Sequence, residues 1–264
     1  MWGPQAVRRS ALLVLAAGST LLLLWLLGGQ GPVQGQAVSG TIAVGNAPLG
    51  VAVDPQRGIL YVTNSADGTV SVATLSGQIT ATIPVGSGPN GVDIDLGSNL
   101  VYVANFTSGT VSVIDGASGQ VTSTVPAGAG AFGVAWYPGT PLVFVTNAQE
   151  ASVSVLRAGV LSGTIPLGSG SFPYGIAADL PRGRVYVADF AQNRLVLIDA
   201  LSQQVVGQWQ GNGLNGPYGL TVDPATGTVY VANSSGNTLS VFASTGQAIG
   251  TPIPVGNDPR WVAL

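Results

Sequence analysis

Asp93 is the residue of this chain whose chemistry stands out most clearly from its surroundings. It lies in the segment GVDID, and four matching segments hold an uncharged residue at its position: Ala52, Ala135, Ala177 and Thr221. A carboxylate beside a channel can bind a cation or a hydrogen-bond donor. The alternative is a structural role, in which Asp93 bonds a neighbouring strand or faces water. The acidic segment 93–97 lacks the further oxygen ligands of a known calcium loop, so it predicts no metal site.

A second candidate site is a set of large side chains that recur at related positions. One group stands directly before a glycine that recurs along the chain, or before the residue that replaces this glycine, and the other group lies in loops. A rim with several aromatic rings can hold a sugar, a peptide or a planar ligand. The other interpretation is that each ring only plugs the mouth of a channel. The candidate ligand-binding residues are Asn90, Phe106, Phe132, Glu150, Tyr174, Phe190, Tyr218 and Arg260.

The composition limits the chemistry that these residues could support. The chain has no His, Cys or Lys, so the commonest general base, the thiol nucleophile and the usual zinc and haem ligands are missing. We therefore predict no catalytic residues and no cofactor. The net charge is −3, and no basic run follows Arg9, which argues against nucleic acid as a partner.

The elements that must position these residues come from an internal repeat. The segment YVTN at 61–64 returns in related form along the chain, and its aromatic residue advances by 41, 42, 42 and 44 residues. A glycine marker keeps the same steps. Two independent markers with one period indicate a structural repeat. The aromatic markers are Tyr61, Tyr102, Phe144, Tyr186 and Tyr230, and the glycines are Gly50, Gly91, Gly133, Gly175 and Gly219.

One repeat predicts four short antiparallel strands, near residues 51–53, 58–64, 69–75 and 79–85. A four-stranded sheet with apolar residues on both faces must stack against copies of itself, and radial stacking gives a β-propeller. Pro84 then lies on the outermost strand, where it blunts an exposed edge. We expect the Asn or Asp that closes each YVTN-like motif to bond nearby backbone amides in a turn.

The segments PLGVAVDP, YVTN, TVSVIDG and TIPVG together resemble the YVTN-type β-propeller repeat, a relative of NHL repeats, over residues 38–264. The resemblance implies that the first strand of each repeat lies innermost, at the channel, and that the IPVG strand lies outermost. It also implies an exported or cell-surface protein. It says little about activity, because such proteins have mixed roles.

The predicted fold is all-β, with five complete blades and an incomplete sixth. The repeats lie near 48–88, 89–130, 131–172, 173–216 and 217–258. An orphan outer strand is expected at 38–44 and an orphan inner strand at 260–264. Two middle strands of that blade are missing from the repeat pattern. The chain is then either a truncated six-bladed protein or five blades with two loose ends.

Residues 1–37 do not share the repeat. Arg8 and Arg9 precede an apolar run from Ala11 to Leu27, and small residues follow at Gly35 and Ala37. This layout is typical of a secretory signal, with cleavage plausible after Ala37, and an uncleaved membrane anchor is the alternative. Both place residues 38–264 outside the cytoplasm, in the periplasm, at the cell surface or in the medium.

These observations favour a non-catalytic binding or interaction scaffold of the cell envelope, with an envelope protein, a glycan or a peptide as partner. A membrane is a partner only through an uncleaved N-terminal segment. The alternative is a lyase or a lactonase-like hydrolase with a site at the channel mouth. Propellers of those kinds use His or several carboxylate ligands, and this chain offers Asp93 alone on its inner strands.

Overall fold

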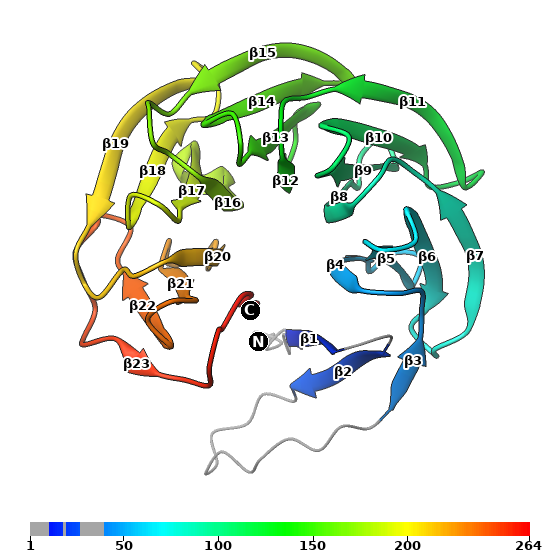
Figure 1. The fold of residues 1–264 in the computed structure, drawn as a ribbon, viewed down its shortest axis with the longest axis horizontal. Helices are drawn as coiled ribbons and strands as arrows, with labels where there is room; N and C mark the ends of the chain where they lie inside the picture. Colours follow the sequence, from blue (N-terminus) through cyan, green and yellow to red (C-terminus); the bar gives the residue numbers. More distant parts are fainter. Residues whose placement is uncertain (1–10, 18–19, 27–39) are drawn as a thin grey trace, which may run out of the picture.

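A ring of five four-stranded antiparallel blades makes up most of the molecule (Figure 1). The structure, a computed structural model, describes residues 11–17, 20–26 and 40–264, with side chains described from residue 40 onward. Each blade runs from an inner strand at the channel to an outer strand at the rim. The predicted all-β propeller, with five complete blades, is confirmed.

The strands of the first three blades follow the repeat. Blade one consists of β4 (Pro48–Asp54), β5 (Ile59–Asn64), β6 (Thr69–Thr74) and β7 (Ile79–Pro84). Blade two consists of β8 (Pro89–Asp95), β9 (Leu100–Asn105), β10 (Thr110–Asp115) and β11 (Gln120–Pro126). Blade three consists of β12 (Ala131–Tyr137), β13 (Leu142–Asn147), β14 (Ser152–Arg157) and β15 (Val160–Pro166).

The last two blades repeat the pattern with small departures. Blade four consists of β16 (Pro173–Asp179), β17 (Arg184–Asp189), β18 (Arg194–Asp199) and β19 (Gln204–Gln210). Its first turn holds the single helical element of the described residues, the 3-10 helix η1 (Leu180–Arg182). Blade five consists of β20 (Pro217–Val222), β21 (Val229–Asn233), β22 (Thr238–Phe242) and β23 (Ile253–Pro254).

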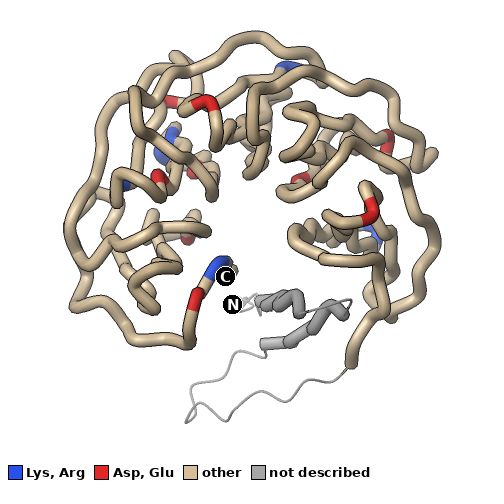
Figure 2. Tube along the Cα trace, viewed as in Figure 1, with Lys and Arg blue, Asp and Glu red and all other residues tan. Residues whose placement is uncertain are grey.

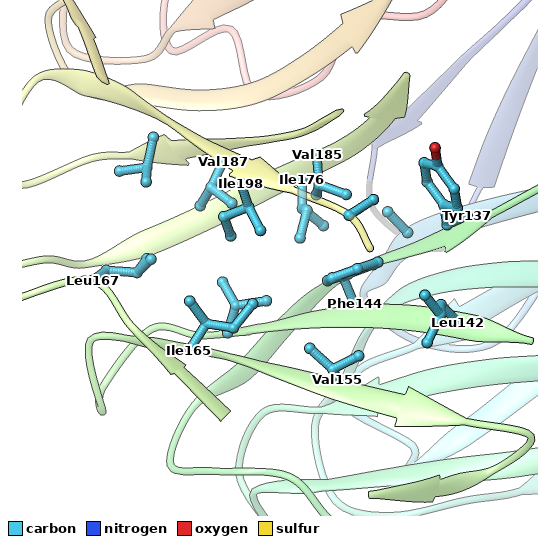
Figure 3. Packing of buried hydrophobic residues seen from close by; sticks show 14 residues of the cluster. Tyr137, Leu142, Phe144, Val155, Ile165, Leu167, Ile176, Val185, Val187 and Ile198 are labelled. Atoms are coloured by element: carbon cyan, nitrogen blue, oxygen red, sulfur yellow. The ribbon is translucent and has the colours of Figure 1, made fainter. Parts of the chain in front are cut away.

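The core lies between blades rather than inside them. One face of each sheet packs on the opposite face of the next, because successive side chains of a strand point to opposite sides. Figure 3 shows this packing between blades three and four, where Phe144, Val155 and Ile165 meet Ile176 and Ile198. The motif aromatics of the first four blades are almost fully buried between blades, with Phe144 0% and Tyr186 1% exposed. The alternating apolar pattern therefore supplies the surface that joins the blades.

The repeated glycine sets how closely the inner strands approach. A Cβ built on Gly91 would lie 2.4 Å from the carbonyl oxygen of Phe132 on the next inner strand. A Cβ built on Gly133 would lie 2.5 Å from the carbonyl oxygen of Tyr174. No side chain fits at that separation. In blades one and three a threonine reinforces the contact: Thr146 accepts the N–H of Gly133 at 2.8 Å and donates to the oxygen of Tyr174 at 2.7 Å.

The residue that ends each YVTN-like motif is buried, but its partners are not those that we expected. The amide of Asn147 donates to the hydroxyl oxygens of Ser152 and Ser154, both at 2.9 Å, instead of bonding turn amides. Ser154 in turn donates to the carbonyl oxygen of Ala127, in the connection from the preceding blade. The expected backbone partner occurs at Asp189, which accepts the N–H of Phe172 at 2.9 Å. The motif therefore ties strands and neighbouring blades together.

Two of these asparagines, Asn105 and Asn233, also match the sequence pattern of a glycosylation acceptor. Both are 0% exposed, and each amide donates to two hydroxyl groups of the adjacent strand. A sugar cannot be attached to either side chain in the folded chain.

The outer strands carry the prolines as predicted. Pro84, Pro126, Pro166 and Pro254 each end the outermost strand of a blade. Charged residues are few and scattered around the ring (Figure 2).

The structure does not show the incomplete sixth blade that we expected from 38–44 and 260–264. Strand β3 (Thr41–Ala43) lies within the expected outer strand 38–44, but residues 260–264 form no strand. They nevertheless follow the path of an inner strand, because a Cβ on Gly219 would lie 2.2 Å from the carbonyl oxygen of Arg260. They are not a strand because no described strand pairs with them.

The N-terminal segment contributes two further strands. β1 (Ala11–Ala17) pairs antiparallel with β2 (Thr20–Leu26), and β2 pairs antiparallel with β3. In Figure 1 this sheet lies in the sector between blade one and blade five. The expected cleavage site after Ala37 lies outside the described residues, so the assignment of 1–37 as a signal or an anchor stays a prediction. In the described part of the chain, no helix is long and apolar enough to cross a membrane.

Candidate functional site: the aromatic mouth of the channel

The inner strands surround a cavity of about 810 Å³ at the centre of the ring. Its walls come from β4, β8, β12 and β16 on one side and from residues 256–263 on the other. Most of the lining side chains are apolar, such as Val51, Val92, Val134 and Ile176. This volume lies in the range of small-molecule sites.

Seven aromatic rings contact one another next to this cavity, which Trp261 also lines, and we call them the mouth cluster. They come from blades two to five and from the C-terminal segment. The mouth cluster consists of Phe106, Phe132, Phe172, Tyr174, Phe190, Tyr218 and Trp261.

The rings contact one another from blade to blade. The ring centroids of Tyr174 and Tyr218 lie 4.5 Å apart in a stacked arrangement, and those of Phe132 and Tyr174 lie 4.6 Å apart. Trp261 stacks on Phe132 at 6.3 Å and meets Tyr218 edge-on at 6.0 Å. Such pairs contribute beyond their buried area and hold the rings in place. The cluster is therefore a preformed surface.

The repeat explains why these rings converge. Phe132, Tyr174 and Tyr218 each stand directly before the glycine that brings two inner strands together, and Phe106 and Phe190 each follow the buried residue that ends a second strand. Equivalent positions of successive blades lie side by side around the axis. A large residue at the same step of several repeats must therefore meet its equivalents at the mouth.

The rings differ in how much surface they offer. Phe132 is 4% exposed and lies at the centre of the cluster, where it contacts four other rings. Phe106, Tyr174, Phe190 and Tyr218 are half-buried. Trp261 is 40% exposed and also lines the cavity. The mouth thus has a packed base and an accessible aromatic surface above it.

A polar anchor fixes the C-terminal segment beside these rings. Asp258 accepts from Arg260 Nη2 at 2.8 Å and from the hydroxyl of Ser234, and its own N–H donates to the side chain of Asn237 at 2.8 Å. The Arg260 guanidinium carbon lies 5.4 Å from the centre of the Tyr218 ring, which is cation–π distance. Residues 258–261 are therefore held against blade five.

The phenols of the cluster stay neutral over the ordinary pH range. Burial raises the pKa of Tyr218 to about 12, against the opposing effect of the nearby Arg260. Burial also raises the pKa of Tyr174. Arg260 and the Ser234 hydroxyl hold the pKa of Asp258 below its usual range, so this carboxylate pairs with Arg260 as an ion.

The structure places six of the eight predicted rim residues together. Phe106, Phe132, Tyr174, Phe190 and Tyr218 belong to the mouth cluster, and Arg260 packs on it. The remaining two residues act locally. Asn90 is 7% exposed, and its carbonyl oxygen accepts the hydroxyl of Thr63 from the preceding blade. The carboxylate of Glu150 accepts the N–H of Ala129 at 2.8 Å within the blade connections.

Sequence reasoning missed two members of the cluster, Phe172 and Trp261. Trp261 stands at the position of the repeated glycine in the C-terminal copy, so the repeat pattern contained the signal. Phe172 lies two residues before Tyr174, in a connection whose sequence varies between copies. Only its contact with Tyr174, at 5.3 Å between ring centroids, identifies it.

Asp93 lies on the channel wall and spans two blades. One carboxylate oxygen accepts the N–H of Trp136, on the inner strand of the next blade, at 2.7 Å, and the other accepts the N–H of Ile94 at 2.8 Å. Burial raises the pKa of this carboxyl to about 6, although both hydrogen bonds oppose the rise. The contacts agree with the structural interpretation, in which Asp93 bonds a neighbouring strand.

The described residues contain no group of three or more carboxylates that could hold a metal ion. The chemistry that the mouth offers is accordingly that of ring faces, phenol hydroxyls and one internal ion pair. These groups suit non-covalent recognition.

Comparisons with known proteins support the fold alone. Neither a protein-family model nor a curated protein matches the chain. Among solved structures, a functionally unknown protein from Desulfotomaculum acetoxidans DSM 771 superposes with a TM-score of 0.77 at 16% identity, over 97% of this chain and 85% of that chain. Hydrazine synthase from Kuenenia stuttgartiensis gives a TM-score of 0.62 at 15% identity, over 88% of this chain and 92% of that chain. The resemblance to YVTN-type and NHL repeats stays a prediction. By its architecture and its structural neighbours, the chain is a β-propeller.

Proposed function

We propose that this protein is an exported β-propeller of the cell envelope that binds a partner without catalysis, through the mouth cluster. The observation that carries the proposal is the convergence of seven aromatic rings from four blades and the C-terminal segment, beside a central cavity that Trp261 lines. Aromatic residues dominate the energetics of binding sites because they bury a large area at a low cost in conformational entropy.

The partner is a glycan, a peptide or an exposed segment of an envelope protein. The cation that packs on Tyr218, Arg260, is paired with Asp258, so the pair offers no net charge to an ionic ligand. Half-exposed ring faces favour a ligand with apolar faces of its own. The neutral phenols of Tyr174 and Tyr218 supply hydrogen bonds.

The enzymatic alternative, a lyase or a lactonase-like hydrolase, depended on Asp93. Both oxygens of its carboxylate accept backbone N–H groups, and the described residues contain no group of three or more acids that could bind a metal. The export part of the proposal is supported by residues 1–37, in which two arginines precede a long apolar run.

The test is a screen of the full chain on glycan and peptide arrays, followed by titration calorimetry with the strongest binder. Trp261→Ala removes the most exposed ring of the cluster. Loss of a central aromatic contact raises a dissociation constant by about tenfold or more. We expect that rise for Trp261→Ala and for Tyr174→Ala.

Leu201→Ala is the matched control, because Leu201 is 70% exposed and lies in a turn between β18 and β19. It should leave the dissociation constant unchanged. Binders that Trp261→Ala and Tyr174→Ala leave unaffected would contradict the assignment of the mouth, and so would arrays without any binder that depends on these rings.

A further inference from the structure

Blade four departs from the other blades at the end of its second strand. In blades one, two, three and five this strand ends with an asparagine, whose amide donates to the hydroxyl groups of two residues of the third strand. Blade four has a carboxylate in place of the asparagine, an arginine in place of the first hydroxyl residue and a valine in place of the second. These residues are Asp189, Arg194 and Val196. Blade four thus has a different hydrogen-bond network at this end.

Asp189 and Arg194 form a buried ion pair. Arg194 Nε donates to one carboxylate oxygen of Asp189 at 2.9 Å. The Asp189 side chain is 0% exposed, and the Arg194 side chain is 17% exposed. The other carboxylate oxygen accepts the N–H of Phe172 at 2.9 Å. The carboxylate of Asp189 therefore connects the arginine to a member of the mouth cluster.

The guanidinium of Arg194 also holds the connection from blade three to blade four, residues 167–172. Its Nη2 donates to the carbonyl oxygen of Leu167 at 3.0 Å and to the hydroxyl oxygen of Ser171 at 2.9 Å. In blade three, Ser154 donates to the first residue of the equivalent connection alone. Arg194 therefore fixes both ends of its connection, because a guanidinium is a planar fork that can donate to several acceptors at once.

The connection 167–172 is longer than those that join the first three blades. The earlier connections comprise residues 85–88 and 127–130. The last residue of the longer connection is Phe172, whose ring centroid lies 5.3 Å from that of Tyr174 in an edge-to-face arrangement. The connection that Arg194 holds therefore carries a ring of the mouth cluster.

The loop between β17 and β18 supports this connection from its other side. The N–H of Phe190 donates to the carbonyl oxygen of Phe172 at 3.1 Å, and the side chain of Gln192 donates to the carbonyl oxygen of Gly170 at 3.0 Å. Phe190 also meets Tyr174 edge-on, with ring centroids 5.4 Å apart. The three rings that blade four contributes to the mouth cluster thus depend on one polar network.

We propose that Asp189 and Arg194 are positioning residues of the mouth. Their ion pair holds the connection 167–172 so that Phe172 packs on Tyr174 in the arrangement that a bound partner contacts. The contact with a partner rests on the proposed function, whereas the placement of the connection does not. Both residues act through Phe172, because the contacts above occupy their polar atoms.

The first experiment measures hydrogen–deuterium exchange of the full chain without a ligand. A triple variant combines Asp189→Asn, Arg194→Thr and Val196→Ser. It gives blade four the residue types that blades one, two and five have at these positions, so the blade keeps a network that the chain uses elsewhere. We expect amide exchange in the segment 171–174 to be about tenfold faster, because the connection opens without the guanidinium, and exchange in β17 and β18 to be unchanged.

Two further variants separate positioning from stability. Arg184→Thr removes an arginine from the other end of β17, where it pairs with Asp199 at 2.7 Å, and should leave exchange of the segment 171–174 unchanged. Ser171→Ala removes one acceptor of the guanidinium, keeps the ion pair and should speed exchange of this segment. Unchanged exchange in the triple variant and in Ser171→Ala overturns the proposal. Faster exchange across all strands of blade four also overturns it, because the pair then acts on stability alone.

The second experiment uses the strongest array binder that Tyr174→Ala weakens. The triple variant and Phe172→Ala should each raise its dissociation constant about fivefold or more. Combining them should raise it no further than the larger single effect, since changes that act through one ring are not additive. Effects that multiply, or a triple variant that binds as tightly as the wild type, overturn the proposal. If no binder depends on Tyr174, the proposed function fails, and the exchange experiment still decides whether the pair positions the connection.

Discussion

At the scale of single residues, the glycine of each inner strand decides how closely two blades approach. Gly91 has an ordinary backbone conformation, so its role is spatial rather than conformational. Its missing Cβ allows the Phe132 carbonyl of the next blade to lie where a methyl group would stand. The contact is with backbone on both sides and cannot be relieved by a rotamer change.

We therefore expect Gly91→Ala to lower the free energy of unfolding by about 3 kcal/mol, at the upper end of ordinary overpacking costs. Gly207→Ala is the control, because a Cβ there meets nothing within 4 Å, and its effect should stay within about 0.5 kcal/mol. Urea titrations of both variants measure the difference. Equal stabilities would mean that the inner strands are not in contact as described.

Asp93 gives a prediction about pH. Its pKa is raised to about 6 in the folded chain, whereas an unfolded Asp titrates near 3.9. Between these values the unfolded chain releases its proton first, so folding stability falls as the pH rises and the loss is complete above the folded pKa. Each pKa unit corresponds to about 1.4 kcal/mol, and solvent at this half-buried site reduces the total to about 2 kcal/mol.

The Asp93→Asn variant lacks this titration. Its free energy of unfolding, minus that of the wild type, should rise by about 2 kcal/mol between about pH 4 and about pH 7. Chemical denaturation at several pH values gives this difference. A difference that is flat with pH, or that falls as the pH rises, would show that Asp93 titrates normally or with a lowered pKa.

Residue types predicted part of this site. The substitution of Asp for Ala was visible in the repeat, and so were five rings of the mouth cluster. The hydroxyl partners of the asparagines were not, because they come from an adjacent strand and their identity depends on register. Phe172 could not be predicted either, since it lies in a connection without a repeated pattern.

At the scale of elements, residues at the same strand position contribute differently to the free energy of unfolding in different blades. Tyr186 on β17 is packed between blades four and five, with its ring centroid 5.2 Å from that of Trp209. Tyr230 on β21 holds the same position in blade five, the last blade, and is half-buried. The alternation of apolar residues predicted both strands, and only the arrangement of blades separates the two tyrosines.

Tyr186→Ala should cost about 4 kcal/mol, as expected for truncation of a fully buried aromatic residue. Tyr230→Ala should cost about 1–2 kcal/mol, because less area leaves the core. Thermal and urea unfolding of the two variants gives the comparison. If both cost the same amount, the face of blade five is covered as fully as the others.

The strand predicted at 260–264 shows the limit of sequence patterns at this scale. Its residues match the start of an inner strand and lie on that path, but a strand is defined by the hydrogen bonds of a partner. The match therefore predicted the position of the segment and not its pairing.

At the scale of the whole molecule, the ring brings the residues that vary between repeats together on one surface. Five copies of a scaffold place equivalent positions side by side around the axis, and the variable residue before each glycine then meets its equivalents at the mouth. The period of the repeat predicted the ring. It could not predict which end carries the site, because that depends on the direction in which each side chain leaves its strand.

The most direct test of the mouth is hydrogen–deuterium exchange of the full chain with and without the strongest binder from the arrays. We expect slower exchange on binding in the segments around Phe106, Phe132, Tyr174, Tyr218 and Trp261, with the outer strands β7, β11, β15 and β19 unchanged. Protection confined to those outer strands, with the mouth segments exchanging as before, would contradict it.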